Sequence, residues 1–140
     1  MSIPSPPSER IFDLGAYVLG PSHEQVLALL SARIGAFVPE YADEDTAMYG
    51  CGEIVLTLSE SVDGFLSVYL ARCRLWPDDV AFARYLAQAL ACVVRCDPGA
   101  AYPEVSPYSP VFLEVSGSGE SLVTWDEVED DIDPEPPAPP

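Results

Sequence analysis

The sequence predicts an α+β fold, with two helices packed on one face of a mainly antiparallel sheet of about five strands, in the order β-α-β-β-α-β-β. Two hairpin turns, around Val62-Asp63-Gly64 and Gly117-Ser118-Gly119, join strand-like segments. Two other segments carry apolar residues at helical spacing. Alternation of strands and helices could also build a parallel sheet. The hairpins require antiparallel neighbours, and they therefore favour helices on a single face.

The first two elements are a strand over residues 11–19 and a helix that begins at Ser22. Ser22 and Gln25 have the spacing of a capping box, in which each side chain satisfies a backbone donor of the other residue. Gly35 and Pro39 are expected to end this helix. Its apolar stripe consists of Val26, Leu27, Leu30 and Ile34.

Residues 41–52 are expected to form an exposed loop, because they combine Asp43, Glu44 and Asp45 with several glycines. Residues 53–59 and 65–75 then form the first antiparallel pair, since Asp-Gly between two apolar runs is a strong hairpin signal.

A second helix follows Trp76 and extends to about Arg95. Pro77, Asp78 and Asp79 suit its first turn, because proline needs no donor there and acids favour the positive end of the helix dipole. After a loop over residues 100–110, residues 111–115 and 122–125 form the second hairpin. The apolar stripe of this helix consists of Val80, Ala83, Leu86, Ala87, Leu90 and Val94.

The charge of the chain is strongly negative. There are 23 acidic residues against six basic ones, all arginine, and the formal net charge is -17. Seven of the acids lie between Asp126 and Glu135, next to a proline-rich end, so residues 126–140 are predicted to be a disordered tail. Residues 1–125 are predicted to be one domain, which keeps sixteen acids and the six arginines. The expected domain is therefore acidic in its own right.

This composition excludes several classes of partner. An acidic surface repels nucleic acid and anionic lipid, and no apolar run approaches the roughly 20 residues that span a bilayer. The amino terminus lacks a secretory signal, so a cytoplasmic location is expected. Only one pair of cysteines has a spacing used in zinc sites, and we expect the cysteines to be reduced and mostly buried, with no metal or other cofactor. The four are Cys51, Cys73, Cys92 and Cys96.

No catalytic motif accompanies the charge. The chain has no nucleophile elbow, phosphate-binding loop or metalloprotease motif, and its one histidine, His23, is expected at a helix start on the surface. We therefore predict a binding protein rather than an enzyme. A small enzyme with Asp78 or Glu53 as general base is an alternative, although nothing distinguishes these carboxylates from the many others.

Two candidate surfaces combine acidic residues with tyrosines, which supply charge and stiff contact area to a basic partner. Arg72, Arg74, Arg84 and Arg95 are expected to neutralise nearby acids rather than to form a phosphate site. Trp125 is expected to fill the core. The predicted partner-binding residues are Glu40, Tyr41, Asp43, Glu44, Asp45 and Tyr49 on the first surface, and Tyr102, Glu104 and Tyr108 on the second.

A small acidic α+β protein that ends its last strand with Ser121-Leu122-Val123-Thr124-Trp125-Asp126-Glu127 resembles the immunity proteins encoded beside bacterial polymorphic toxins. The resemblance implies a cytoplasmic antitoxin that occludes the active site of one cognate toxin, often a basic nuclease or nucleotide-modifying enzyme. Acidic groups that meet a basic cleft would speed the encounter.

Two other binding functions remain as alternatives. A secretion chaperone of the type III kind would also be a small acidic α+β protein, but it would dimerise and hold an effector segment in extended form. Mimicry of DNA would require regularly spaced surface carboxylates.

Overall fold

The computed structural model describes residues 13–99, 102, 104–105 and 110–125. These residues form eight strands, two α-helices and one short 3-10 turn. In chain order they are β1 (Leu14–Leu19), α2 (His23–Ile34), β2 (Val38–Ala42), β3 (Thr46–Cys51), β4 (Ile54–Glu60), η1 (Val62–Gly64), β5 (Phe65–Ala71), α3 (Asp79–Leu90), β6 (Val93–Cys96), β7 (Val111–Ser116) and β8 (Gly119–Thr124).

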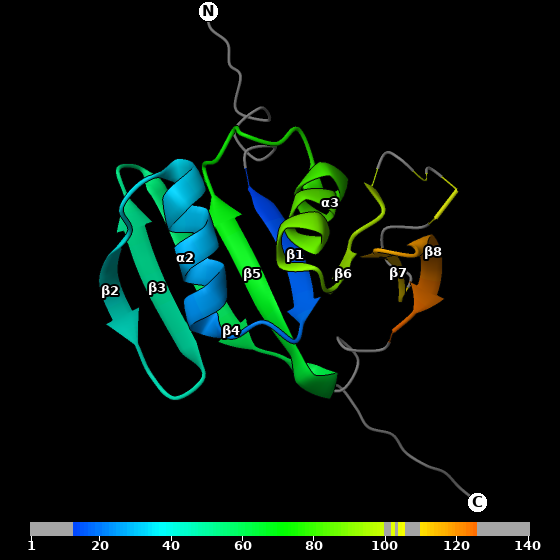
Figure 1. The fold of residues 1–140 in the computed structure, drawn as a ribbon, viewed down its shortest axis with the longest axis horizontal. Coiled ribbons are helices and arrows are strands. Elements are labelled where there is room, and N and C mark those ends of the chain that lie inside the picture. Colours follow the sequence, from blue (N-terminus) through cyan, green and yellow to red (C-terminus); the bar gives the residue numbers. More distant parts are fainter. Residues whose placement is uncertain (1–12, 100–101, 103, 106–109, 126–140) are drawn as a thin grey trace, which may run out of the picture.

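The strands build one sheet in the order β2-β3-β4-β5-β1-β6-β7-β8, and every neighbouring pair is antiparallel. Both helices lie on the same face, with α3 packed against β1, β6 and β7 (Figure 1). The predicted α+β class is confirmed. The predicted strand number was wrong: the sheet has eight strands rather than about five, and the element order is β-α-β-β-β-β-α-β-β-β.

The face of the sheet under the helices forms the main core. Alternation along a strand sends every second side chain to this face, and in β1, β4, β5, β6 and β7 these side chains are almost fully buried. The cross-strand register places Val18 of β1 between Leu66 of β5 and Val94 of β6. Val26 and Leu30 of α2 and Phe82 and Leu86 of α3 close the core from above.

Helix α2 begins as the sequence predicts. The Ser22 side chain accepts a hydrogen bond from the backbone N–H of Gln25, and the Gln25 side chain accepts one from the backbone N–H of Ser22. This arrangement is the capping box. Gly35 is the carboxyl cap, and its N–H donates to the carbonyl of Ser31. Pro39 lies in β2 and has no part in the helix end.

Helix α3 is shorter than predicted. Asp78 caps its amino end by accepting a hydrogen bond from the backbone N–H of Ala81. The helix ends at Leu90 rather than near Arg95, because Ala91 adopts a left-handed conformation with φ 52°. Val94, which continues the helical spacing from Leu90, belongs to strand β6 and faces the same core. Residues four apart lie on one face of a helix, and residues two or four apart lie on one face of a strand. The spacing of Leu90 and Val94 therefore does not reveal where the helix ends and the strand begins.

Residues 41–52 are not a loop. They contribute to β2 and β3, which form a hairpin with a bulge between Pro39 and Tyr41. Asp43 turns the chain, because its Oδ1 atom accepts hydrogen bonds from the backbone N–H groups of Asp45 and Thr46. This is the Asx-type turn that favours aspartate. The hairpins at β4–β5 and β7–β8 are confirmed. Their predicted bounds were wrong in part, because β5 ends at Ala71 rather than at residue 75 and β8 begins at Gly119 rather than at residue 122.

A second, smaller apolar cluster lies on the opposite face of the sheet. Trp125 is 6% exposed and contacts three aromatic rings, from Tyr17, Phe65 and Phe112. Its indole Nε1–H donates to Asp63 Oδ2 at 2.8 Å. Trp125 is therefore buried, as predicted, but on the face away from the helices.

Some predicted features lie outside the described residues. These are residues 11 and 12 of the first strand, most of the loop over residues 100–110, and the predicted disordered tail 126–140. Within the described part of the chain, neither helix has the length and apolar character needed to cross a bilayer. Cys73 and Cys96 are buried, Cys51 and Cys92 are partly exposed, and the cysteines are free.

Candidate acidic binding surfaces

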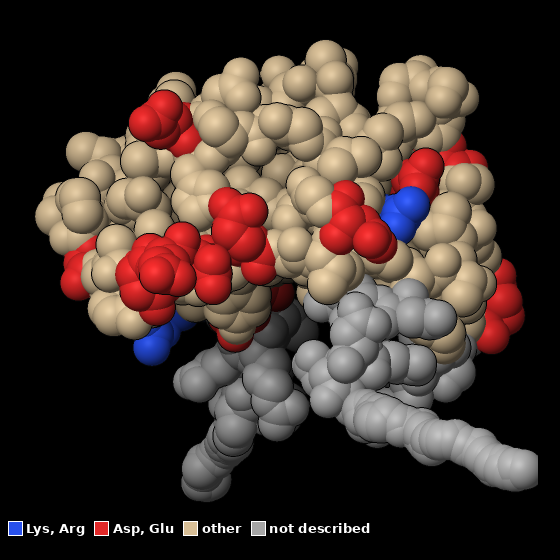
Figure 2. Space-filling model, turned by 90° about the horizontal axis from the view of Figure 1, so that it is seen from below, with Lys and Arg blue, Asp and Glu red and all other residues tan. Residues whose placement is uncertain are grey.

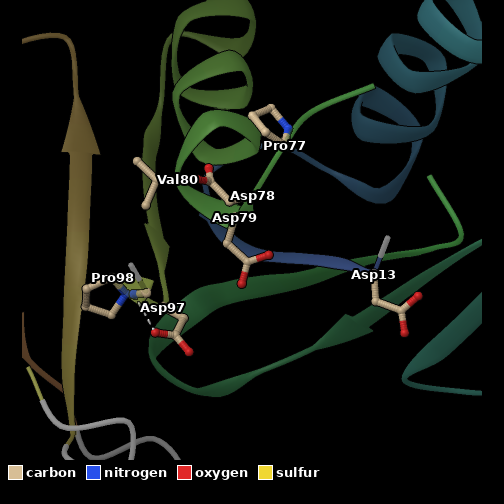
Figure 3. Close-up of a pocket in the computed structure, with 8 residues that line it drawn as sticks. Asp13, Pro77, Asp78, Asp79, Val80, Asp97 and Pro98 are labelled. Atoms are coloured by element: carbon tan, nitrogen blue, oxygen red, sulfur yellow. Dashed lines mark hydrogen bonds between the residues drawn. The ribbon is translucent and has the colours of Figure 1, made fainter. Parts of the chain in front are cut away.

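A cleft of about 210 Å³ opens where the amino end of α3 meets the start of β1 and the end of β6 (Figure 3). Four aspartates from three separate segments lie around it, and none of the described residues that line it is basic. We call this site the acidic cleft. Its lining residues are Asp13, Pro77, Asp78, Asp79, Val80, Asp97, Pro98 and Gly99.

The acidic cleft exists because two neighbouring strands separate. Strand β6 pairs with β1 only from Tyr17 to Leu19, and the chain leaves the sheet after Cys96. The edge of β1 at Gly15 therefore has no strand beside it. The Asp79 carboxylate takes the place of the missing strand, because its Oδ1 accepts the Gly15 N–H at 3.0 Å.

Each of the other three aspartates also accepts hydrogen bonds from the protein. Asp78 caps α3, and Asp97 accepts from the backbone N–H of Gly99 at 2.9 Å. Asp13 accepts from the Tyr69 hydroxyl at 2.6 Å and from the backbone N–H of Arg72 at 3.1 Å. These bonds hold the carboxylates in place, so the negative charge at the cleft has a fixed geometry.

Asp79 is the most buried of the four, and its carboxylate points into the opening, with Asp97 on one side and Asp13 on the other (Figure 3). The pKa of Asp79 is raised to about 6, mainly by burial and in smaller part by the negative charges of Asp97 and Asp78. The hydrogen bond from Gly15 acts in the opposite direction. A cation in the cleft would stabilise the charged form and lower this pKa.

The cleft is suited to a cationic group on an apolar stem. Its carboxylates offer acceptors to an ammonium or guanidinium group, and Pro77, Val80 and Pro98 offer apolar walls. Among the described residues, no three histidine, cysteine or acidic side chains are arranged to hold a metal ion. The lining residues therefore fit a lysine or arginine side chain.

A second acidic region lies at the opposite end of the molecule, which Figure 2 shows from below with much red and little blue on its surface. The β2–β3 turn supplies Asp43, Glu44 and Asp45 to it, and the Asp45 carbonyl accepts a hydrogen bond from the backbone N–H of Glu60. The Glu60 carboxylate contacts His23 Nε2 at 3.0 Å. We call Asp43, Glu44, Asp45 and Glu60 the acidic end.

The structure brings only part of the first predicted surface together. Glu44 and Asp45 are exposed at the turn. Asp43 is exposed but used by the fold: hydrogen bonds from Tyr41 and from two backbone N–H groups lower its pKa, and the same contact raises the pKa of the Tyr41 hydroxyl.

The remaining two residues of that surface lie apart from each other. Glu40 lies at the bulge, and its carboxylate lies close over Gly50. A Cβ atom at residue 50 would collide with the Glu40 carboxylate, which would have to move. Tyr49 packs partly buried against the main core, on the helix-covered face, rather than beside Tyr41. Tyr49 therefore exposes less of its side chain than Tyr41 does.

The second predicted surface is at the other edge of the sheet. Tyr102 packs partly buried against the main core, close enough to Arg84 to influence its pKa, and Glu104 is exposed. Tyr108 lies outside the described residues. Strands β2 and β8 are the two edges of the eight-stranded sheet and are therefore separated by about 34 Å at the usual strand spacing. The two predicted surfaces do not form one site.

Sequence reasoning did not place the acidic cleft. Asp78 and Asp79 are recognisable as a helix start, but Asp13 and Asp97 are far from them in the chain. Only the fold brings these residues together, and no local spacing signals it. Among the arginines, the prediction of neutralised acids is confirmed for Arg84, which binds Glu120, and for Arg95, which binds Glu114.

Comparison of the chain with protein-family models, with curated proteins and with solved structures gives no significant match.

Proposed function

We propose that the protein is an immunity protein that binds and occludes a basic bacterial toxin through its acidic surface. The observation that carries the proposal is the acidic cleft, where four aspartates held by hydrogen bonds surround an opening with apolar walls. A lysine or arginine from the partner fits this chemistry. The described residues as a whole contain fifteen acids and five arginines, a formal charge of -10.

The cleft and the overall charge would act at different stages of binding. The long-range negative field speeds the encounter with a basic partner and weakens as salt rises. The cleft then contributes short-range contacts, because carboxylates that are already fixed lose little entropy when a cation binds. Salt should therefore slow association strongly, and loss of the cleft carboxylates should mainly speed dissociation.

The first experiment is affinity capture of the tagged chain from its native host over a salt series, with the captured proteins identified by mass spectrometry. We expect one folded basic protein that is lost as salt rises. Its toxicity on expression should be relieved by co-expression of this chain. Capture of an extended secretion substrate together with dimerisation would instead support a secretion chaperone and would contradict the proposal.

The second experiment tests whether the cleft is the contact. Asp79→Asn with Asp97→Asn removes two charges but keeps an acceptor oxygen at each position, so the Gly15 and Gly99 hydrogen bonds can persist. The matched control is Glu44→Gln with Asp45→Asn, which removes the same charge at the acidic end.

We expect the cleft variant to weaken binding of the captured partner by ten-fold or more, a typical value for lost charge-assisted contacts. The control should change affinity only through the association rate. Equal effects of the two variants would mean that only net charge matters, and the cleft would then not be the binding site.

A further inference from the structure

The two edges of the eight-stranded sheet differ in how well they could accept another strand. Strands β2 and β8 each have one neighbouring strand among the described residues, and they lie at opposite sides of the molecule (Figure 1). An edge strand presents backbone N–H and C=O groups that can pair with a strand of another chain. Natural proteins protect such edges with proline, bulges or charged side chains.

Strand β2 carries all three kinds of protection. Pro39 has no backbone N–H to donate, and the bulge between Pro39 and Tyr41 interrupts the register with β3. Glu40 adds a charge at the bulge. A further strand would therefore find no regular row of donors and acceptors along β2.

Strand β8 is regular along its whole length. Its six residues pair with β7 without a register shift, and none of them is proline. The hydrogen bond from the Trp125 N–H to the Pro110 carbonyl, at 2.7 Å, continues this pairing beyond the strand. Bonded and non-bonded pairs alternate in an antiparallel ladder, so every second residue counted from Trp125 bonds to β7. The residues between them point their backbone groups toward the open edge, and these are Glu120, Leu122 and Thr124.

The side chains of β8 carry little charge, although the chain as a whole is acidic. Glu120 is the one charged residue of the strand, and Arg84 neutralises it through Nε at 2.6 Å and Nη2 at 2.9 Å. Leu122 lies opposite Leu113 of the main core, yet it is 40% exposed. The strand therefore offers an exposed apolar side chain and no unpaired carboxylate to attract a basic segment.

We infer that β8 pairs with β8 of a second copy of this chain, antiparallel about a two-fold axis at Leu122. About this axis Leu122 lies opposite its own counterpart in the other copy, and Glu120 lies opposite Thr124. No like charges then face each other, which would destabilise the pair. A two-fold contact uses the same surface on both copies, so the exposed Leu122 side chains cover each other.

This dimer should be weak, and salt should strengthen it. Pairing along one strand of about 20 Å is a smaller contact than the interfaces of about 1,200–2,000 Å² that hold stable complexes. Each copy also carries a formal charge of -17, and the two copies repel each other unless salt screens the charge. Salt therefore acts here in the opposite direction from its expected effect on toxin binding.

The first test is sedimentation velocity of the full chain at several protein concentrations, in roughly 0.01 to 1 M salt. We expect the mass to rise from 15.1 kDa toward twice that value as protein concentration and salt increase. A monomer under all these conditions, or a dimer that dissociates as salt rises, would overturn the inference.

A charge swap at the axis tests the register. Leu122→Glu and Leu122→Lys each place like charges opposite each other, so each variant alone should dimerise at least ten-fold more weakly than wild type. A mixture of the two places opposite charges across the axis and should recover the dimer. The two changes alter the net charge by one unit in opposite directions, so recovery in the mixture cannot come from net charge.

The matched control is the same swap at Val38 of β2, which is 60% exposed at the other edge. Val38→Glu and Val38→Lys should leave dimerisation unchanged, alone and mixed. Thermal unfolding establishes that each variant is folded. An equal loss in the Val38 variants, or no recovery when the Leu122 variants are mixed, would overturn the inference.

The outcome is independent of the proposed function. These measurements use this chain alone, and the acidic cleft contains no residue of β8. A dimer by itself also does not identify a secretion chaperone, which would be distinguished by its extended substrate. Leu122 variants that lose toxin capture but dimerise like wild type would assign the edge to the toxin, and they would overturn the pairing with a second copy.

Discussion

Asp79 Oδ1 accepts a hydrogen bond from the backbone N–H of Gly15 at 3.0 Å, and this contact joins α3 to β1 across 64 positions of sequence. The bond replaces the strand pairing that β1 lacks once β6 has left the sheet. It also directs the carboxylate into the acidic cleft (Figure 3). One residue thereby connects the stability of the sheet to the chemistry of the cleft.

Removal of the Asp79 acceptor should destabilise the protein. Asp79→Ala leaves the Gly15 N–H without its partner, whereas Asp79→Asn keeps an oxygen that can accept the bond. We expect Asp79→Ala to be less stable than Asp79→Asn by about 1–2 kcal/mol, because the partly buried Gly15 N–H loses its acceptor. Urea unfolding at pH 5 measures this difference. Equal stability of the two variants would mean that a water molecule accepts the hydrogen bond of the Gly15 N–H in Asp79→Ala.

The pH dependence of stability should report the raised pKa of Asp79. This pKa is about 6 in the folded protein and about 3.9 in an unfolded chain. The folded state therefore binds the proton more tightly. The stability that Asp79 contributes is complete below about pH 4 and is lost as the pH rises through 6.

In Asp79→Asn this loss should be absent. Urea midpoints of wild type and variant, measured from pH 4 to pH 7, should show wild type losing stability relative to Asp79→Asn as the pH increases. Asp45→Asn at the acidic end is the control for removal of a carboxylate. Parallel curves for wild type and Asp79→Asn would contradict the assignment of the pKa near 6 to this residue.

Helix α3 ends at a residue that glycine should improve. Ala91 is exposed and left-handed, with φ 52° and ψ 52°, and this conformation is costly for a residue with a Cβ atom. We expect Ala91→Gly to raise the free energy of unfolding by about 0.5–1 kcal/mol. Ala89→Gly, at an exposed position inside the same helix, should lower it by about 1 kcal/mol. A destabilised Ala91→Gly variant would argue against the left-handed cap.

The same cap explains why the end of α3 could not be predicted from the sequence. Glycine usually marks the left-handed residue after a helix, but here alanine occupies that position. Leu90 and Val94 also preserve the helical spacing across the boundary. The adjacent β-branched residues Val93 and Val94 were the available signal for a strand. Residues 93–96 form a strand because they pair with β1 and β7. This pairing joins residues that are far apart in the sequence, so no local pattern reveals it.

The two edge-side strands β2 and β3 were missed for a different reason. All five residues of β2 are exposed, so the strand carries no buried alternation for a pattern to reveal. In β3, Ala47 and Tyr49 do face the core, but Gly50 and the three acids of the turn made the segment resemble a loop. The capping box, the hairpins and the apolar stripes of the two helices were predictable because their signals are local in the sequence.

The candidate sites also divide into features that the sequence shows locally and features that depend on the fold. Composition alone predicted an acidic folded surface, but the acidic cleft depends on three aspartates that are far apart in the chain. Asp13 precedes β1, Asp79 begins α3, and Asp97 follows β6. From its sequence context, Arg72 was expected to neutralise nearby acids. Its guanidinium instead donates to a backbone carbonyl.

Arg95 should be sensitive to replacement by lysine. Its guanidinium lies 4.7 Å from the Phe65 ring centroid and 4.9 Å from that of Trp125, and it donates to Glu114 at 3.0 Å from a largely buried position. Lysine keeps the charge but cannot lay a planar group against the two rings. We expect Arg95→Lys to lower the free energy of unfolding by about 1–2 kcal/mol and to alter Trp125 fluorescence.

Arg84→Lys is the matched control, since Arg84 also binds a carboxylate but is 55% exposed. Exposed pairs contribute little, so its loss of stability should stay below about 0.5 kcal/mol. Urea unfolding of the two variants compares a stacked, partly buried guanidinium with an exposed one in the same protein. A cost for Arg95→Lys no larger than that for Arg84→Lys would mean that the ion pair, not the stacking on Phe65 and Trp125, holds this face of the sheet together.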